Sequence, residues 1–200
     1  EADGGVHNIR VLRNRGVNAA HTGLSAQPIF GGPAYYIRNV IYNTPVALKF
    51  INPAGVIVYH NTIIAEHRTA TQLSNAHFRN NLFLGTDAAA GIAALGGPTA
   101  YSTYDYNGYR PNRGAARQFT WFGPKPGVAV DYEMAPEAAQ GFSTRAELAA
   151  ATGQETHGID VDYDIFEDLR PPSPPDSSKP GTPFDAVDLN FRLKPASVAV

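Results

Sequence analysis

A short strand-like segment that ends in asparagine recurs along the first half of the chain. Five copies align, with central residues at 14, 39, 61, 80 and 106; the first four are asparagine and the fifth is tyrosine. Irregular spacing of this size is typical of a solenoid whose turns differ in loop length. Asparagine tolerates the left-handed backbone of a turn, and its amide can bond to a stacked copy. The repeat therefore predicts an all-β parallel β-helix with stacked asparagines.

Two columns of side chains precede the repeated residue, because side chains alternate between the two faces of a strand. The residues two positions before it are apolar or aromatic, and we expect them to point into the core: Leu12, Ile37, Tyr59, Phe78 and Tyr104. The residues one position before it are polar, and we expect them to point to solvent: Arg13, Arg38, His60, Arg79 and Asp105.

The repeat stops at residue 111. We expect 1–110 to form the turns of the β-helix, and 111–200 to form a loop-rich covering layer and C-terminal cap of the same domain, since the end of a solenoid exposes unpaired backbone groups. In the cap we expect one short helix, which Thr144 and Glu147 open with a capping box and Gly153 ends. A final strand near 189–193 is expected to return to the stack.

Composition excludes several classes of function. A formal net charge of -2 gives no electrostatic drive toward nucleic acid or an anionic membrane. The chain has no cysteine, which rules out disulfides and thiolate chemistry. No apolar run approaches the ~20 residues that a membrane span needs. Neither end of the sequence shows a cap, so we expect a piece of a longer protein whose exposed first turn, near Val6, could associate with another copy.

Several segments carry a resemblance to a known family. They read Tyr-His-Asn-Thr-Ile-Ile at 59–64, Phe-Arg-Asn-Asn-Leu-Phe at 78–83 and Asp-Tyr-Asn-Gly-Tyr at 105–109. These segments resemble the right-handed parallel β-helix repeat proteins of the pectate-lyase-like superfamily. The tail at 188–200 resembles the closing motif of bacterial members, but lacks the acidic residue and glycine that normally follow. The resemblance implies that fold and a secreted, extracellular or periplasmic location. It does not fix an activity, because this superfamily includes lyases, hydrolases, epimerases and non-catalytic adhesins.

The polar column offers the clearest functional hypothesis. Parallel strands lie about 4.8 Å apart, so Arg13, Arg38, His60 and Arg79 would form a basic ladder that repels itself unless anions or acids offset the charge. An acidic polysaccharide is the predicted partner, since guanidinium groups pair with carboxylates. The alternative is that these side chains are solvated and that their stems merely cover apolar surface.

A lyase that removes the proton beside a uronate carboxyl group needs a base close to cations. His60 or Lys49 could be this base, with Arg38 beside it. Tyr36 and His77 could add a stacking surface for sugar rings. A hydrolase would need paired carboxylates, which the repeat nearly lacks.

No cofactor is firmly predicted. The acidic run at Asp160, Asp162 and Asp164 could bind calcium through oxygen atoms, although it lacks the ligand spacing of a calcium loop. The histidines show no metal-ligand spacing. The hypothesis is therefore a polysaccharide lyase-like protein. The alternatives are a non-catalytic structural or adhesin β-helix, or a fragment whose active site lies in turns outside this sequence.

Overall fold

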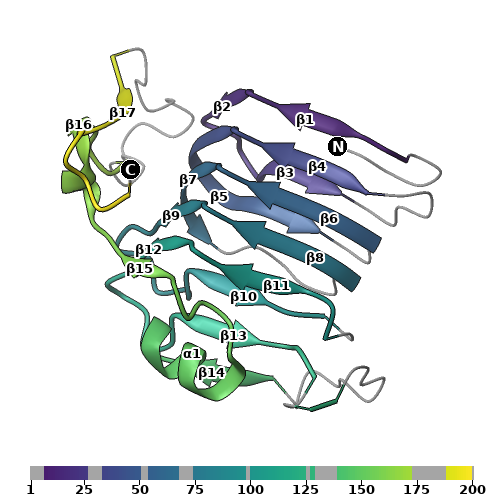
Figure 1. Cartoon of the computed structure of the whole chain (residues 1–200). Helices are drawn as coiled ribbons and strands as arrows, with labels where there is room; N and C mark the ends of the chain where they lie inside the picture. The colour runs from purple at the N-terminus through teal and green to yellow at the C-terminus, as the bar shows by residue number, and fades with distance from the viewer. Residues whose placement is uncertain are drawn as a thin grey trace.

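The computed structural model describes residues 7–26, 33–50, 54–67, 74–97, 100–124, 127–128, 139–172 and 188–199. They form a parallel β-solenoid of about four turns with one short α-helix (Figure 1). The predicted all-β parallel β-helix is thus confirmed. Among these described residues, no helix has the length and apolar character needed to cross a bilayer.

Two parallel sheets form the main walls of the solenoid. The first sheet has five strands in the order β1 (Arg10–Leu12), β4 (Ala34–Ile37), β6 (Ala54–Tyr59), β8 (Ser74–Arg79) and β11 (Thr103–Asp105). The second sheet runs β2 (Arg15–Val17), β5 (Val40–Phe50), β7 (Thr62–His67), β9 (Leu82–Leu84), β12 (Gly108–Arg110) and β15 (Ile159–Asp160), with β3 (Thr22–Ala26) also paired to β5. The chain passes from the first sheet to the second in every turn of the solenoid.

A third sheet joins β10 (Ala93–Leu95), β13 (Phe119–Trp121) and β14 (Gln140–Phe142). β13 is parallel to β10, and β15 is parallel to β12, so solenoid pairing continues beyond the predicted boundary at residue 110. The helix α1 (Arg145–Thr152) follows a capping box of Thr144 and Glu147, and Gly153 ends it in a left-handed conformation, as predicted.

The last strand does not return to the stack, so that prediction was wrong. β17 (Asn190–Leu193) pairs antiparallel with β16 (Phe166–Asp168), which follows the short 3-10 helix η2 (Tyr163–Ile165). This pair covers the outer face of the second sheet, where the ring of Phe191 lies 5.7 Å from that of Tyr42. In β7 and β9, consecutive apolar residues are buried on both faces of the sheet, which fits their runs at 63–65 and 82–84.

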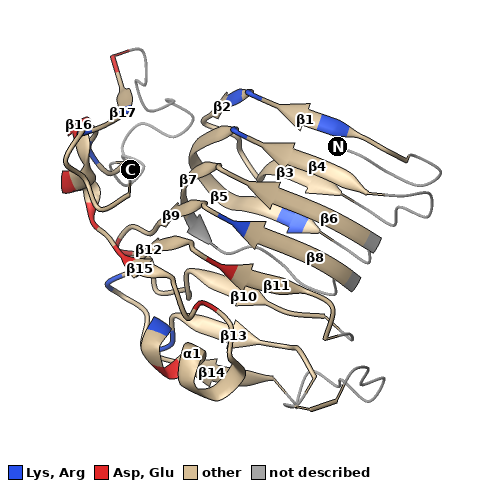
Figure 2. Cartoon of the chain, viewed as in Figure 1, with Lys and Arg blue, Asp and Glu red and all other residues tan. Residues whose placement is uncertain are grey.

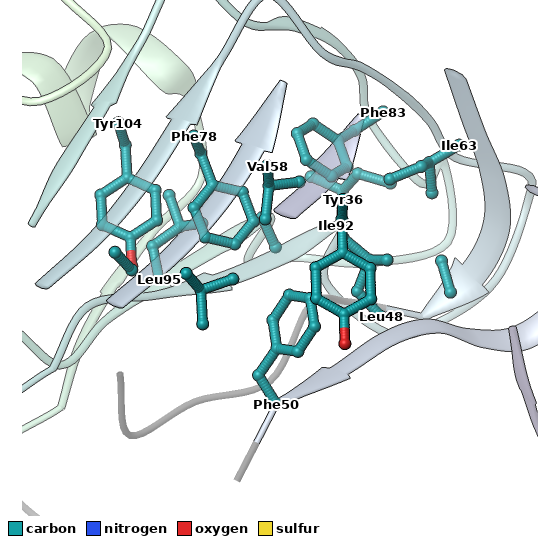
Figure 3. Packing of buried hydrophobic residues seen from close by; sticks show 14 of the residues in the cluster. Tyr36, Leu48, Phe50, Val58, Ile63, Phe78, Phe83, Ile92, Leu95 and Tyr104 are labelled. Atoms are coloured by element: carbon teal, nitrogen blue, oxygen red, sulfur yellow. The ribbon is translucent and has the colours of Figure 1, made fainter. Parts of the chain in front are cut away.

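The core lies between the sheets and contains stacked aromatic rings (Figure 3). The rings of Phe78 and Tyr104 are 5.0 Å apart, as are those of Tyr36 and Phe50. The inward column of the first sheet differs from the predicted one at its first three positions. It consists of Val11, Tyr36, Val58, Phe78 and Tyr104.

Leu12, Ile37 and Tyr59 were predicted to be inward but belong to the outward column, and Leu12 is 45% exposed. The cause is a left-handed residue between the two sheets in each turn: Arg13, Arg38, His60, Asn80 and Tyr106, with φ between 55° and 60°. This residue turns the backbone, so the simple alternation of a strand does not continue through to the asparagine.

An asparagine ladder joins the turns beneath this corner. It consists of Asn14, Asn39, Asn61, Asn81 and Asn107, so the fourth and fifth copies had been aligned one residue too early. The side-chain amide of each of the first four asparagines donates to the Oδ1 atom of the next one, over 2.9 to 3.1 Å. The backbone amide of each of these four donates to the same Oδ1 atom. The ladder pairs buried polar groups that would otherwise destabilise the fold.

Glu155 ends the asparagine ladder. Its Oε1 atom accepts hydrogen bonds from Nδ2 of Asn107 and from the hydroxyl of Tyr109, both over 2.7 Å. The nearby residues Gln154 and His157 also form hydrogen bonds with β11, to Tyr104 and Asp105 respectively. The segment 154–158 therefore attaches the helix α1 to the last turns of the solenoid.

Candidate functional site

A row of exposed side chains runs along the corner between the first and second sheets. It starts with the left-handed residues of the turns and ends at His157. Gly108 pairs with Ile159, so Tyr106 and His157 occupy equivalent positions. Their rings stack with centroids 4.7 Å apart. We call this set the turn row: Arg13, Arg38, His60, Asn80, Tyr106 and His157.

A groove of about 570 Å³ lies at the His157 end of the turn row. His60, Asn80, Tyr106 and His157 line its polar side. The other side is largely apolar and includes Leu82 and Ile159 of the second sheet and Leu193, Val198 and Ala199 of the C-terminal tail. A volume of this size accommodates a small ligand or one end of a larger one.

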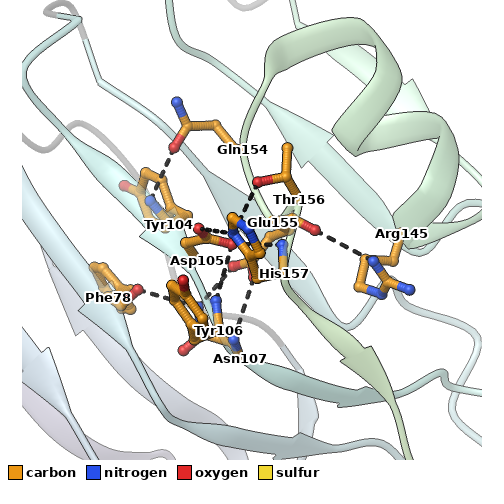
Figure 4. Close-up of polar contacts among 10 residues, drawn as sticks. All are labelled: Phe78, Tyr104, Asp105, Tyr106, Asn107, Arg145, Gln154, Glu155, Thr156 and His157. Carbon is orange, nitrogen blue, oxygen red and sulfur yellow. Dashed lines mark hydrogen bonds and ion pairs between the residues drawn. The ribbon is translucent and has the colours of Figure 1, made fainter.

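Asp105 holds the ring of His157 at one end of this groove (Figure 4). Nδ1 of His157 lies 2.8 Å from Oδ2 of Asp105, and the backbone amides of His157 and Tyr106 donate to Oδ1. Partial burial by itself raises the pKa of Asp105, but the hydrogen bonds from His157 and Tyr106 outweigh it and lower the pKa overall. The carboxylate therefore stays ionised and accepts a hydrogen bond from Nδ1–H of His157. In the neutral ring this tautomer leaves Nε2 unprotonated.

Tyr106 lies between side chains of the preceding and following rungs. The guanidinium carbon of Arg79 is 5.1 Å from the centroid of its ring, and His157 stacks on it from the next rung. Tyr106 is 47% exposed. Arg79 is exposed and takes part in none of the ion pairs among the described residues. The site thus combines a cation, an aromatic ring and a histidine–carboxylate pair.

Arg13, Arg38 and His60 occupy three successive turns, in the same position of each turn. Figure 2 shows cationic segments at the corners where β1, β4 and β8 end, and an acidic one at the end of β11. Arg79 lies just before the turn row, on the outer face of β8. Lys49 is separated from this corner by nearly the whole length of β5, because that strand begins two residues after Arg38 and ends one residue after Lys49.

Tyr36 does not provide a stacking surface, contrary to the prediction. Its side chain is in the core and 1% exposed, and its hydroxyl donates to the carbonyl of Ser25. Burial raises its pKa to about 12. The prediction failed because of the alternation error described above: Tyr36 pairs with Val11 and Val58 in the inward column.

His77 lies on the outer face of β8 and is half-buried. Its ring nitrogens contact Oγ1 of Thr103 at 2.8 Å and Oδ1 of Asn75 at 3.0 Å. Burial, and then the charge of Arg79, lower its pKa and favour the neutral ring. Both nitrogens are occupied by neighbouring side chains, so His77 is already bound within its own sheet.

Asp160 and Asp162, two members of the predicted calcium run, face arginines. Asp160 pairs with Arg145 at 3.1 Å, and Asp162 with Arg110 at 2.7 Å. The described part of the chain contains no group of three or more histidine, cysteine or acidic side chains that could hold a metal ion. Asp162 thus ties the cap to β12, and Asp160 ties β15 to the start of α1.

No family model, curated protein or solved structure matches this chain. The site is therefore interpreted from its own residues. Among these, the pairing of Asp105 with His157 and the exposure of Tyr106 were not predicted from the sequence. The sequence carries a signal for this turn, because Tyr-Asn-Gly-Tyr at 106–109 and His-Gly-Ile at 157–159 both follow the pattern of a corner residue, a small or amide residue and a strand.

Proposed function

We propose that this protein is a secreted, carbohydrate-active member of the pectate-lyase-like β-helix proteins, and that it binds an acidic polysaccharide along the turn row. The observation that carries the proposal is the stack of Arg13, Arg38 and His60 at equivalent positions of successive turns, leading into the groove. Neither arginine takes part in the ion pairs of the described residues.

The spacing of these groups suits a polymer rather than a single small anion. Successive turns lie about 4.8 Å apart, so an extended chain parallel to the solenoid axis would pass one side chain after another. Carboxylates on such a chain would offset the repulsion between the stacked cations. The apolar side of the groove, which includes Leu82 and Leu193, could contact the apolar face of a sugar ring.

Replacing both arginines, Arg13→Gln with Arg38→Gln, is expected to weaken binding to polyuronates at least about 10-fold, because charge-assisted hydrogen bonds contribute about 1.5 to 3 kcal/mol each. Isothermal titration calorimetry at two salt concentrations would measure the loss of affinity and show how far salt screens the charge interactions. The control is Arg117→Gln, which alters an exposed arginine beside β13 of the third sheet. Equal affinity of the double variant and wild type, or a wild-type preference for neutral glycans, would contradict the proposal.

A structural or adhesive β-helix is the second candidate, and the outer face of the first sheet favours it. Leu12 is largely exposed, and Tyr35, Ile37, Ile57 and Tyr59 beside it are half-buried. Apolar side chains gathered on one face often mark a protein contact.

If this face mediates contact between copies, wild type should self-associate, and a Leu12→Lys/Ile57→Lys variant should sediment as a monomer. Analytical ultracentrifugation over a concentration series measures both. A wild-type protein that remains monomeric throughout the series would remove this candidate. A Thr120→Lys variant, altered in the third sheet, is the control for added charge.

A further inference from the structure

We infer that the first turn of the solenoid is a docking edge for a β-strand turn of another polypeptide, and that it selects a turn with an asparagine three residues after an apolar residue. This inference does not depend on the proposed binding of a polysaccharide. Its basis is the order of donors and acceptors in the asparagine ladder, together with the exposed end of the core at β1.

The two ends of the first sheet differ. At one end the segment 154–158 bonds to β11: the side chain of Gln154 accepts from the amide of Tyr104, and the amide of Glu155 donates to the carbonyl of Tyr104. At the other end β1 pairs with β4, and no other strand of the described residues pairs with it. Within the described part of the chain β1 is therefore an edge strand, the kind of strand to which an extended peptide can add.

Backbone groups of β1 are directed toward this edge. The carbonyl of Ile9 and the amide of Arg13 bond to β4. In a parallel pair, residues that bond to the neighbouring strand alternate with residues whose backbone groups point the other way. The amides of Arg10 and Leu12 consequently face the edge, where an added strand could accept from them.

The end of the core is incompletely covered at this turn. Val11 points inward but is only half-buried, whereas Tyr36 and Val58, at the same position of the next two turns, are 1% and 0% exposed. Ile9 also packs against the core and is also half-buried. A turn stacked on β1 would bury this apolar surface as each turn does for its neighbour, and such burial favours association.

The asparagine ladder specifies what the added turn has to carry. Oδ1 of every later asparagine accepts two hydrogen bonds, from the side-chain and backbone amides of the asparagine before it. Oδ1 of Asn14 accepts none from the described residues, to which Asn14 is bonded through its donors and its backbone carbonyl. An asparagine in the added turn would supply both missing donors.

A second contact fixes the spacing within the added turn. The side-chain amide of Asn39 donates to the carbonyl of Val11, the inward residue of the preceding turn, and each later asparagine of the ladder repeats this contact. Val11 lies three residues before Asn14, and the same interval recurs in every turn of the ladder. The added turn therefore needs an apolar inward residue three positions before its asparagine, with a carbonyl that can accept from Asn14.

The closed end of a second copy does not meet this requirement. The ladder finishes there on Glu155, which accepts from Asn107 and Tyr109 and is 0% exposed. The helix α1 lies at the same end, with Leu148 in the core. A carboxylate and Oδ1 of Asn14 are both acceptors and form no hydrogen bond with each other. The partner is thus a different polypeptide that carries the asparagine turn.

The experiment uses the full chain and a synthetic peptide that copies residues 54–65, with lysines added at both ends for solubility. This peptide contains Val58 and Asn61 at the required spacing. We expect it to bind with a Kd below about 1 mM. An Asn61→Asp peptide is expected to bind at least about 10-fold more weakly, because its carboxylate cannot donate to Asn14. Isothermal titration calorimetry measures both affinities.

A Leu12→Pro variant of the protein locates the binding edge. Proline removes the amide that faces the edge but leaves the bonds from β1 to β4 in place. We expect this variant to bind the asparagine peptide at least about 10-fold more weakly than wild type. The matched control is Leu12→Thr, which keeps the amide and suits a strand, and its Kd should stay within about 2-fold of wild type. Circular dichroism shows whether each variant is folded.

Hydrogen exchange on the wild type gives a test that needs no variant. The peptide should protect amides of β1 and β2, and leave those of β11 unchanged. Equal binding of the two peptides, absence of binding at about 1 mM peptide, or protection outside β1 and β2 would each overturn the inference. A folded Leu12→Pro variant with wild-type affinity would do the same. The binding of polyuronates is tested separately by the arginine variants and stands or falls without this result.

Discussion

Replacing Asn81 by alanine is expected to lower the free energy of unfolding by about 3 to 5 kcal/mol, which places it among severely destabilising substitutions. Asn81 is 0% exposed. Its amide donates to the carbonyl of Val58 and to Oδ1 of Asn107, and its own Oδ1 accepts two hydrogen bonds from Asn61. Alanine would leave these buried partners unsatisfied, with no access to water.

The adjacent residue provides a matched control. Asn80 is exposed and has a φ of 55°, so Asn80→Gly keeps a backbone that suits this left-handed turn. We expect this substitution to change stability by less than about 0.5 kcal/mol. Urea unfolding monitored by circular dichroism compares both variants with wild type. Equal losses at 80 and 81 would show that the asparagine ladder does not stabilise the fold as described.

Glu155 should make the stability of the protein depend on pH. The side chain is 0% exposed, and burial raises its pKa from 4.5 to about 7, although hydrogen bonds from Tyr109 and Asn107 oppose this. Below pH 4.5 the carboxyl is protonated in both folded and unfolded chains. As pH rises toward 7, the unfolded chain releases this proton more readily than the folded one, so stability falls through this window. The loss is complete above pH 7 and amounts to about 3 kcal/mol.

A Glu155→Gln variant tests this effect directly. Its carbonyl oxygen can still accept from Asn107 and Tyr109, but it carries no charge at any pH. We expect it to equal wild type near pH 4.5 and to exceed it by about 3 kcal/mol at pH 8. Urea unfolding of both proteins across this range gives a difference from which the other titrating groups largely cancel. Parallel stability curves for the two proteins would refute the assignment.

The fold could be predicted from the sequence because each turn repeats the same local requirement. A left-handed corner residue followed by a buried amide leaves the same pattern at 13–14, 38–39 and 60–61. The pattern became ambiguous at 80–81, where asparagine suits both positions. At 80–81 and 106–107 the first residue of each pair was chosen, which misplaced the fourth and fifth copies by one residue. The expected facing of Leu12 and Tyr36 was wrong for a separate reason, because the left-handed corner residue interrupts the alternation of the strand.

The site was only partly predictable, for a different reason. Arg13, Arg38 and His60 belong to the repeat, so their alignment followed from it. His157 reaches Asp105 from 52 residues further along the chain, through the intervening third sheet and α1. The corner pattern recurs there only in the short form His-Gly-Ile at 157–159, and the buried residue that ends the ladder is Glu155 instead of an asparagine.

The asparagine ladder has one direction, and its internal links are all alike. Each member donates to the next and accepts from the one before, and only Glu155 ends the series by accepting. A gene that duplicated or lost one complete turn would rejoin the ladder with the same bonds, provided that the turn kept its corner residue and its asparagine. Proteins of this design can therefore change in length by whole turns through a single genetic event, while the segment that ends the ladder has to be inherited intact.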